Sequence, residues 1–459
     1  MERDSIELGT LNVDKLFRKY FIPTLLGMLS MSAVTAIDGI FVGHGVGSDG
    51  IAAINICIPL YMVLTGIGLM AGAGCSVVAS IHLAQGRLKA ARLNVTQAFL
   101  FVAAVALAIT LPVMVAPDAV GLALGSSDSL LPLVRCYMLW LAPSWVFQVC
   151  GSVAMFTIRL DGSPRIAMWC SLVVAIANTV LDWLFIFPFG WGLMGAALAS
   201  SLSIVIGCLA GMGYMVFAAN HLRLRMPKFS RKSLRLSLRN IGYQCRIGSA
   251  ALLGECTMAV LMFAGNLTFM HYLGDKGVGA FGIACYYAPF VFMVGNAIAQ
   301  SMQPIVSYNF GQGHSLRVRQ ALHTGLATAV LCGLLVTAVF VFAPDLMVHL
   351  FVSPSDPAAS VAVSGFPLFA AGFVFFIVNL TSIGYFQSIE RIRPATTFAI
   401  LRGFALLVPS FCILPLCFGN AGIWLAMPVS EALTTLSVIL FCAMNARTAE
   451  KRPGGQANP

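Results

Sequence analysis

The chain is poor in charged residues, and poorest in acids. Asp, Glu, Lys and Arg make up 10% of its 459 residues, with 17 acids against 27 bases, whereas soluble domains hold about 25%. Hydrophobic residues reach 59%, and the mean hydropathy is +0.89. This composition excludes a soluble globular protein and indicates an integral membrane protein.

The chain also lacks the short motifs of several enzyme classes. It holds no G-x-x-x-x-G-K-[ST] phosphate loop, no H-E-x-x-H, no C-x-x-C pair and no recognisable Ser-His-Asp arrangement. Its 13 cysteines are scattered without the spacing of disulfides or zinc ligands. We therefore expect no enzymatic activity, no cofactor and no direct use of ATP.

The chain does contain long apolar runs. A helix needs about 20 mostly apolar residues to cross a bilayer, and the runs predict an all-α membrane protein with twelve transmembrane helices. The predicted spans are 20–42, 51–78, 95–116, 130–158, 166–187, 193–219, 247–273, 278–306, 322–343, 361–386, 396–417 and 421–444.

Lys and Arg gather in alternate loops between these spans. All 27 except Arg135, Lys276 and Arg402 fall on one side of the predicted membrane. Basic loops face the cytoplasm, so both termini are predicted to be cytoplasmic. The net charge of +10 follows from this asymmetry and gives no reason to expect a nucleic-acid partner.

The sequence repeats itself. A shift of 227 residues places Arg92 on Arg319 and Gly192 on Gly419. Each half holds six predicted helices, and this even number gives the halves one orientation, related by a pseudo-twofold axis along the membrane normal. We divide the chain into an N-terminal six-helix lobe with its cytoplasmic N-terminal segment (1–219), a basic cytoplasmic linker (220–246), a C-terminal lobe (247–446) and a cytoplasmic tail (447–459). The linker has no acid between 223 and 240 and suits the anionic lipids of a membrane surface.

Four acids fall inside the predicted spans: Asp38, Asp182, Glu255 and Glu431. Each costs about 2.5–3.5 kcal/mol at a helix centre on insertion scales, which makes it a functional candidate. Asp38 and Asp182 each lie a few residues before the outer end of a helix, so both are predicted about 8–9 Å below that boundary.

Two polar residues share the level of these acids. Asn178 stands one turn from Asp182, and Ser200 reaches the same level on the next helix. Oxygen and amide ligands suit Na⁺, or a proton shared by two carboxylates. Asn178 and Asp182 correspond to Ala405 and Pro409 in the repeat, so the sequence predicts this site in the first half only.

Several motifs together resemble the MATE (multidrug and toxic compound extrusion) family over nearly the whole chain. The resemblance implies a secondary active antiporter of the bacterial drug-efflux branch, in the cytoplasmic membrane, which exports organic, mainly cationic compounds by alternating access in exchange for H⁺ or Na⁺. The motifs are IDGIFVGHGVG at 37–47, AGAG at 71–74, AQG at 84–86, R-x-x-G-x-P at 159–164, N-x-x-x-D at 178–182, G-x-x-G-A-A-L-A-S at 192–200, MQPIVSYNFGQG at 302–313 and GIW at 422–424.

Matched residue by residue, the resemblance implies an ion-coupling site at Asp38, Asn178, Asp182 and Ser200, with Na⁺ held by the first three if sodium is the ion. Met155 stands where related proteins often have an Asn. This difference removes an amide ligand and leaves both H⁺ and Na⁺ open.

Three further residues are candidates for substrate binding or secondary coupling: Glu255, Arg402 and Glu431. Glu255 and Arg402 are predicted at one depth of the inner half of the membrane, which suggests either a structural ion pair or a role of Glu255 toward substrate or proton. Glu431, in the middle of its span, is expected to face the interior.

Two other functions remain open. A lipid-linked oligosaccharide or lipid flippase of the same superfamily would share the repeat, but it needs a strongly cationic cavity. A channel needs polar rings in both halves, whereas the acids here are unevenly divided. We expect a monomer whose partners are small organic cations and membrane lipids.

Overall fold

The computed structural model describes residues 7–224, 231–353 and 357–450, and all regular structure in this part is helical. Helices satisfy every backbone hydrogen bond within one segment, as a chain in lipid requires. The chain divides into two compact units, Met1–Glu255 and Cys256–Pro459.

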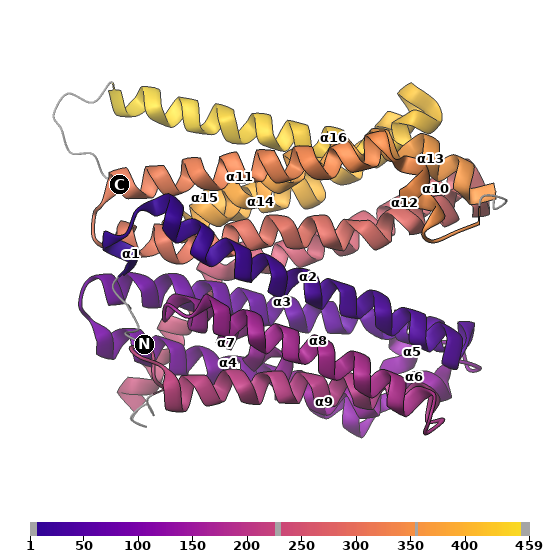
Figure 1. Cartoon of the computed structure of the whole chain (residues 1–459), viewed down its shortest axis with the longest axis horizontal. Coiled ribbons are helices and arrows are strands. Elements are labelled where there is room, and N and C mark those ends of the chain that lie inside the picture. Colours follow the sequence, from indigo (N-terminus) through magenta and orange to yellow (C-terminus); the bar gives the residue numbers. More distant parts are fainter. Residues whose placement is uncertain (1–6, 225–230, 354–356, 451–459) are drawn as a thin grey trace. The chain divides into compact units, whose positions relative to one another are not determined.

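The first unit contains long helices that run alongside one another (Figure 1). Helix α2 packs along α8, α8 along α9, and α3 against both α4 and α7. The elements are α1 (Glu7–Thr10), α2 (Val13–Gly45), α3 (Ser48–Ala84), α4 (Leu88–Val115), α5 (Pro117–Ala123), α6 (Leu131–Leu141), the 3₁₀ turn η1 (Ala142–Ser144), α7 (Trp145–Leu160), α8 (Pro164–Ile186), α9 (Gly192–Gly213), the π-helical turn η2 (Tyr214–Ala218) and the first part of α10 (Arg231–Gly311).

The second unit contains the rest of α10 and the helices that follow it. Helix α14 packs against α11 and α16, and α13 packs against the same two helices. These elements are α11 (Ser315–Phe342), α12 (Pro344–His349), α13 (Pro357–Ala370), α14 (Phe373–Ser388), α15 (Ile392–Ile400), the π-helical turn η3 (Leu401–Ala405) and α16 (Leu407–Glu450). Non-helical dihedral angles break α10 at Gly274 and α16 at Gly419.

The backbone carries the same repeat as the sequence. Pro117 opens the short helix α5, and Pro344, its repeat position, opens α12. Three pairs of repeat-related glycines have positive φ, a conformation that side chains disfavour. These pairs are Gly47 and Gly274, Gly86 and Gly313, and Gly192 and Gly419.

Ten helices of the described chain are long and apolar enough to cross a membrane, and the pair α13 and α14, bent by 45°, raises the number to eleven. The predicted spans 130–158 and 361–386 both correspond to apolar helical stretches, but neither is one continuous α-helix. The first is divided at Ala142–Ser144, where Pro143 lacks the N–H that a helix interior uses. The second is divided between Ala370 and Phe373.

The predicted linker is largely helical. Helix α10 begins at Arg231 and runs without a break into the predicted seventh span, so residues 231–246 belong to the same helix as that span. Residues 225–230 of the linker and 451–459 of the tail lie outside the described residues.

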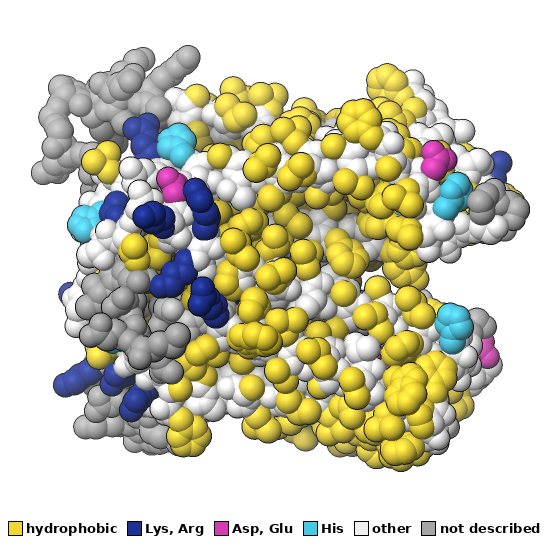
Figure 2. Space-filling view, in the orientation of Figure 1, with side chains coloured by type: hydrophobic (Ala, Val, Ile, Leu, Met, Phe, Trp, Pro, Cys, Tyr) yellow, Lys and Arg dark blue, Asp and Glu magenta, His cyan; other side chains and the backbone are white. Residues whose placement is uncertain are grey.

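The surface of the helices is apolar along most of their length. Leu100, Leu107 and Leu111 of α4 each expose about half of their surface, as side chains that face lipid do. In Figure 2, the visible Lys and Arg side chains of each unit lie mainly at one end of its helices. This distribution matches the alternation of basic loops read from the sequence.

Candidate functional site

Three packed helices of the first unit carry the predicted ion site. Helix α2 supplies Asp38, α8 supplies Asn178 and Asp182, and α9 supplies Ser200. The chain turns back after α8 through a hydrogen bond from the Trp191 N–H to the Phe185 carbonyl, 2.9 Å long. This tight return sets α9 beside α8, so residues far apart in sequence reach one level.

Asn178 and Ser200 are in direct contact. The Asn178 amide donates a hydrogen bond to the Ser200 hydroxyl, 3.2 Å away. Asn178 exposes 2% of its surface and Asp182 none. Helices α2 and α8 pack along one another, and this contact places Asp38 within electrostatic range of Asp182.

The oxygens of this cluster lack hydrogen-bond partners among the described residues. One Asp38 oxygen, both Asp182 oxygens and the Asn178 amide oxygen are buried and accept no hydrogen bond. The Asn178 amide also approaches the Asp182 carboxylate, but outside hydrogen-bond geometry. A buried polar group without a partner is costly. Four such acceptors together favour a cation or proton that completes them.

Two tyrosines near the acids did not stand out in the sequence. Tyr137 on α6 is buried, and its phenol lies within electrostatic range of both Asp38 and Asp182. Tyr61 on α3 lies within reach of the charges of Asp38 and Glu255. A tyrosine in an apolar span is a common residue, so only the packing of the helices reveals these positions.

Glu255 lies on α10 at the end of the first unit. Its side chain packs beside Gly66 of α3, and its charge acts on Tyr61. Glu255 therefore lies near the same tyrosine as Asp38, although the two acids come from different helices.

Arg402 and Glu431 form a buried ion pair in the second unit. The Arg402 Nε and Nη2 groups donate to Glu431 Oε1 over 3.0 and 2.8 Å, and the Asn379 amide donates to Glu431 Oε2 over 2.6 Å. The guanidinium also lies over the ring of Phe376, 4.3 Å from its centroid. Arg402 thus pairs with Glu431 instead of Glu255, the partner suggested by depth, and this network ties α14, η3 and α16 together.

The donor set of the first unit suits a hard cation. Within the described chain, no three His, Cys, Asp or Glu side chains gather as transition-metal ligands. Two carboxylates and an amide oxygen are the ligands that Na⁺ accepts, and two neighbouring carboxylates also share a proton. The residues present therefore fit either ion.

A protein-family model matches the chain twice. The model, described as MatE, covers residues 23–184 and 250–412, one stretch in each repeat. The chain belongs to the MATE family. MATE proteins are ion-coupled membrane transporters, which confirms that the chain is a transporter and not an enzyme.

Two curated MATE relatives are similar over almost the full length. The chain is 24% identical over 442 residues to the multidrug export protein MepA of Staphylococcus aureus, which covers 94% of this chain and 93% of MepA. It is 22% identical over 434 residues to MepA of Staphylococcus saprophyticus, which covers 92% of each.

Two solved structures of transporters of the MOP superfamily have the same fold as this chain. An outward-facing multidrug resistance MATE transporter of the MOP superfamily has a TM-score of 0.90 at 20% identity, over 98% of this chain and 99% of that one. A MOP superfamily transporter from Pyrococcus furiosus, whose binding pocket is described as reversed in polarity, has a TM-score of 0.87 at 19% identity over the same shares. This degree of likeness establishes the fold of the chain.

Proposed function

We propose that the chain exports organic, mainly cationic drugs in exchange for H⁺ or Na⁺ by alternating access. The family match and the similarity to proteins named as multidrug exporters support this function. The observation that carries the ion coupling is the set of four buried oxygens without partners at Asp38, Asn178 and Asp182.

The coupling step follows from the electrostatics of the two acids. Two ionised carboxylates in a low-dielectric lobe repel one another, and a bound Na⁺ or a shared proton removes this repulsion. Occupation of the site would draw α2 toward α8, while release of the ion would let them separate. Gly39 lies beside Asp38 with open space around it, which lets α2 bend or shift at this level.

The charges inside the spans favour cationic substrates. Arg402 is neutralised by Glu431, and Arg135 pairs with Asp118 over 3.3 Å near the outer end of α6. Asp38, Asp182 and Glu255 then dominate the field, which attracts cations. A flippase for lipid-linked oligosaccharides would need free cationic side chains in its cavity, and Arg402 is engaged elsewhere.

The arrangement in the membrane is proposed from the apolar stretches and from the alternation of basic loops. The last apolar stretch, Ile392–Asn445, has 54 residues, enough for two crossings, and counting it as two at Gly419 gives twelve spans in all. We place both termini in the cytoplasm, the two six-helix lobes about a pseudo-twofold axis, and the protein in the bacterial cytoplasmic membrane as a monomer.

Transport by purified protein in liposomes tests this function. We expect export of a fluorescent organic cation under an imposed gradient of H⁺ or of Na⁺, and no export by Asp38→Asn under either gradient. Asp128→Asn is the control, because Asp128 is an exposed acid outside the spans, and it should transport like the wild type. Undiminished export by Asp38→Asn would contradict the assignment and direct attention to Glu255.

A further inference from the structure

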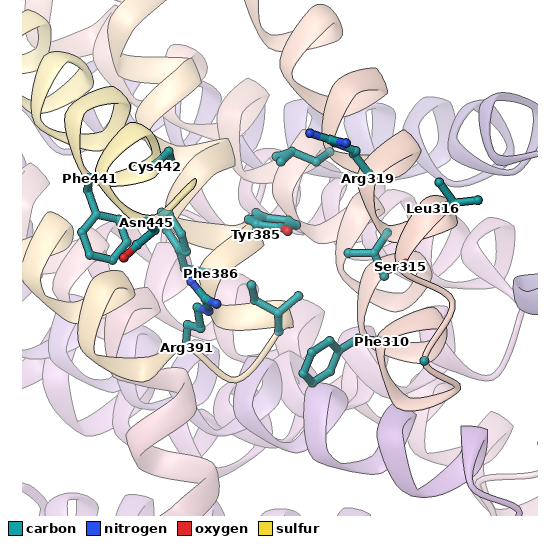
Figure 3. A pocket seen from close by; sticks show the side chains of 14 residues that line it. Phe310, Ser315, Leu316, Arg319, Tyr385, Phe386, Arg391, Phe441, Cys442 and Asn445 are labelled. Carbon is teal, nitrogen blue, oxygen red and sulfur yellow. The ribbon is translucent and has the colours of Figure 1, made fainter. Parts of the chain in front are cut away.

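A cavity of about 460 Å³ opens in the second unit where four helices end or begin. It lies between the end of α10, the start of α11, the end of α14 and the end of α16 (Figure 3). Phe386 and Phe441 form part of its wall, while Tyr385 lies between Arg319 and Arg391 in this view. The wall thus combines apolar rings with two cationic groups.

The charged side chains that line the cavity are all cationic. None of its lining residues is Asp or Glu, and the side chains of Arg319 and Arg391 make no hydrogen bond or ion pair with the described residues. The charges of both arginines reach the Tyr385 phenol. The N-cap of α11, His314, offers no side-chain hydrogen bond to the helix, so the positive end of that helix adds to the field. An anion is the complementary ligand.

The repeat identifies the part of the first unit that corresponds to this cavity. Arg92, the repeat position of Arg319, donates from Nε to the carbonyl of His221. Tyr214, the repeat position of Phe441, donates to Asp161 over 2.8 Å. The same Asp161 carboxylate accepts the backbone N–H groups of residues 220–222. The chain segment after η2 therefore occupies this position in the first unit.

No such segment occupies the cavity of the second unit in the described chain. Helix α16 continues past the repeat position of η2 as far as Glu450, and the lining residues all belong to the helices and turns around the cavity. The tail beyond begins with Lys451 and Arg452, whose charge matches that of Arg319 and Arg391. Like charges disfavour the tail as occupant.

We propose that this cavity binds an anionic phospholipid of the cytoplasmic leaflet, with its phosphate between Arg319 and Arg391 and its acyl chains along Phe386 and Phe441. The site lies at the basic end of the helices, and its assignment to the cytoplasmic leaflet rests on the proposed topology. Basic pockets between spans on the cytoplasmic side recognise lipid headgroups. The volume of this cavity, about 460 Å³, lies within the range of about 300–1,000 Å³ that is typical of small-molecule sites. The lipid would take the place that the linker segment holds in the first unit.

Native mass spectrometry of the purified full-length protein tests the site, with dioleoylphosphatidylglycerol as the probe. Each arginine is worth about a fivefold change in affinity near an anionic surface, so Arg319→Gln with Arg391→Gln should weaken binding of the retained lipid about 25-fold. Arg393→Gln removes the same charge two residues from Arg391, outside the cavity lining, and should bind like the wild type. An equal loss in Arg393→Gln would overturn the proposal.

Two control measurements distinguish a lipid headgroup from a soluble anion, and a further pair of variants controls for misfolding. Dioleoylphosphatidylethanolamine should not be retained, and millimolar inorganic phosphate should not displace phosphatidylglycerol. Displacement by phosphate would assign the cavity to a soluble anion and overturn the lipid. If the double Gln variant melts below the wild type, the single variants Arg319→Gln and Arg391→Gln replace it, and each should weaken binding about fivefold.

Discussion

Asp182 and Glu431 are both almost fully buried acids, but their oxygens have different surroundings. Both Glu431 oxygens accept hydrogen bonds from Arg402 or Asn379, whereas neither Asp182 oxygen has a partner among the described residues. A satisfied carboxylate holds helices together, while an unsatisfied one is left for a ligand. At the scale of the residue, this contrast supports the proposal that Asp182 binds the coupling ion whereas Glu431 stabilises the packing of its helices.

The first prediction concerns Asp38 and Asp182 as a pair. Asp38→Asn and Asp182→Asn should each abolish gradient-driven export, and the double variant should be no worse than either single one, because both remove the same site. Each variant should melt at or above the wild-type temperature, since an amide is cheaper to bury than a carboxylate. Transport in liposomes and thermal melting in detergent measure the two effects. Additive losses of transport would contradict a shared site.

The second prediction concerns the ion pair of the second unit. Glu431→Gln leaves the buried Arg402 guanidinium without a countercharge, a change that costs about 3–5 kcal/mol in other proteins. We expect a clear fall in melting temperature, and substantial recovery when Arg402→Met is combined with Glu431→Leu. An unchanged melting temperature together with lost transport would instead assign Glu431 to the transport cycle.

At the scale of the element, helices α3 and α10 cross very closely within the first unit. A Cβ added at Gly74 would overlap the backbone of Gln244, and one at Gly248 would overlap the backbone of Met70. The Gln244 amide also donates to Asn94 Oδ1 over 2.8 Å, which fixes α10 against α4. Small residues allow such close contacts between helices in membranes, so the first part of α10 is anchored to the first unit.

The third prediction uses two glycines of α10. Gly248→Ala should separate α10 from α3 and lower both the melting temperature and the export rate. Gly242→Ala adds the same methyl group to the same helix in open space and should be neutral or slightly stabilising, because alanine favours helix. Thermal melting of both purified variants makes the comparison, and equal behaviour would show that the crossing is not tightly packed.

At the scale of the whole molecule, we expect the distribution of basic residues to determine which loops face the cytoplasm. The apolar helices are similar along their length, so orientation depends on the Lys and Arg of the short loops. Arg402 is buried and paired with Glu431, so we do not expect it to influence this orientation.

The fourth prediction tests this orientation with single cysteines placed in a chain whose native cysteines have been replaced. A membrane-impermeant thiol reagent should label Ser127→Cys in intact cells, and it should label Leu238→Cys only after the cells are opened. Both positions are exposed. Labelling of Leu238→Cys from outside would reverse the proposed topology.

Much of the fold could be predicted from the sequence because its causes are local. Span length follows from bilayer thickness, and the duplication shows in matched residues such as Arg92 and Arg319. The breaks in the helices could not be predicted, because proline is common in membrane spans and does not always interrupt them. Pro143 lies in the turn that divides its helix, whereas Pro304 lies inside an unbroken part of helix α10. The candidate acids could also be named, since an acid in an apolar span is rare.

The partners of these acids were decided only by the tertiary structure. Glu255 and Glu431 look alike in sequence, yet Glu431 meets Arg402 from 29 residues away. The unpaired oxygens of Asp182 and the arginine-lined cavity likewise depend on how neighbouring helices are rotated. A helix that is apolar on every side does not show in its sequence which face turns inward, so packing between helices alone determines which polar groups meet.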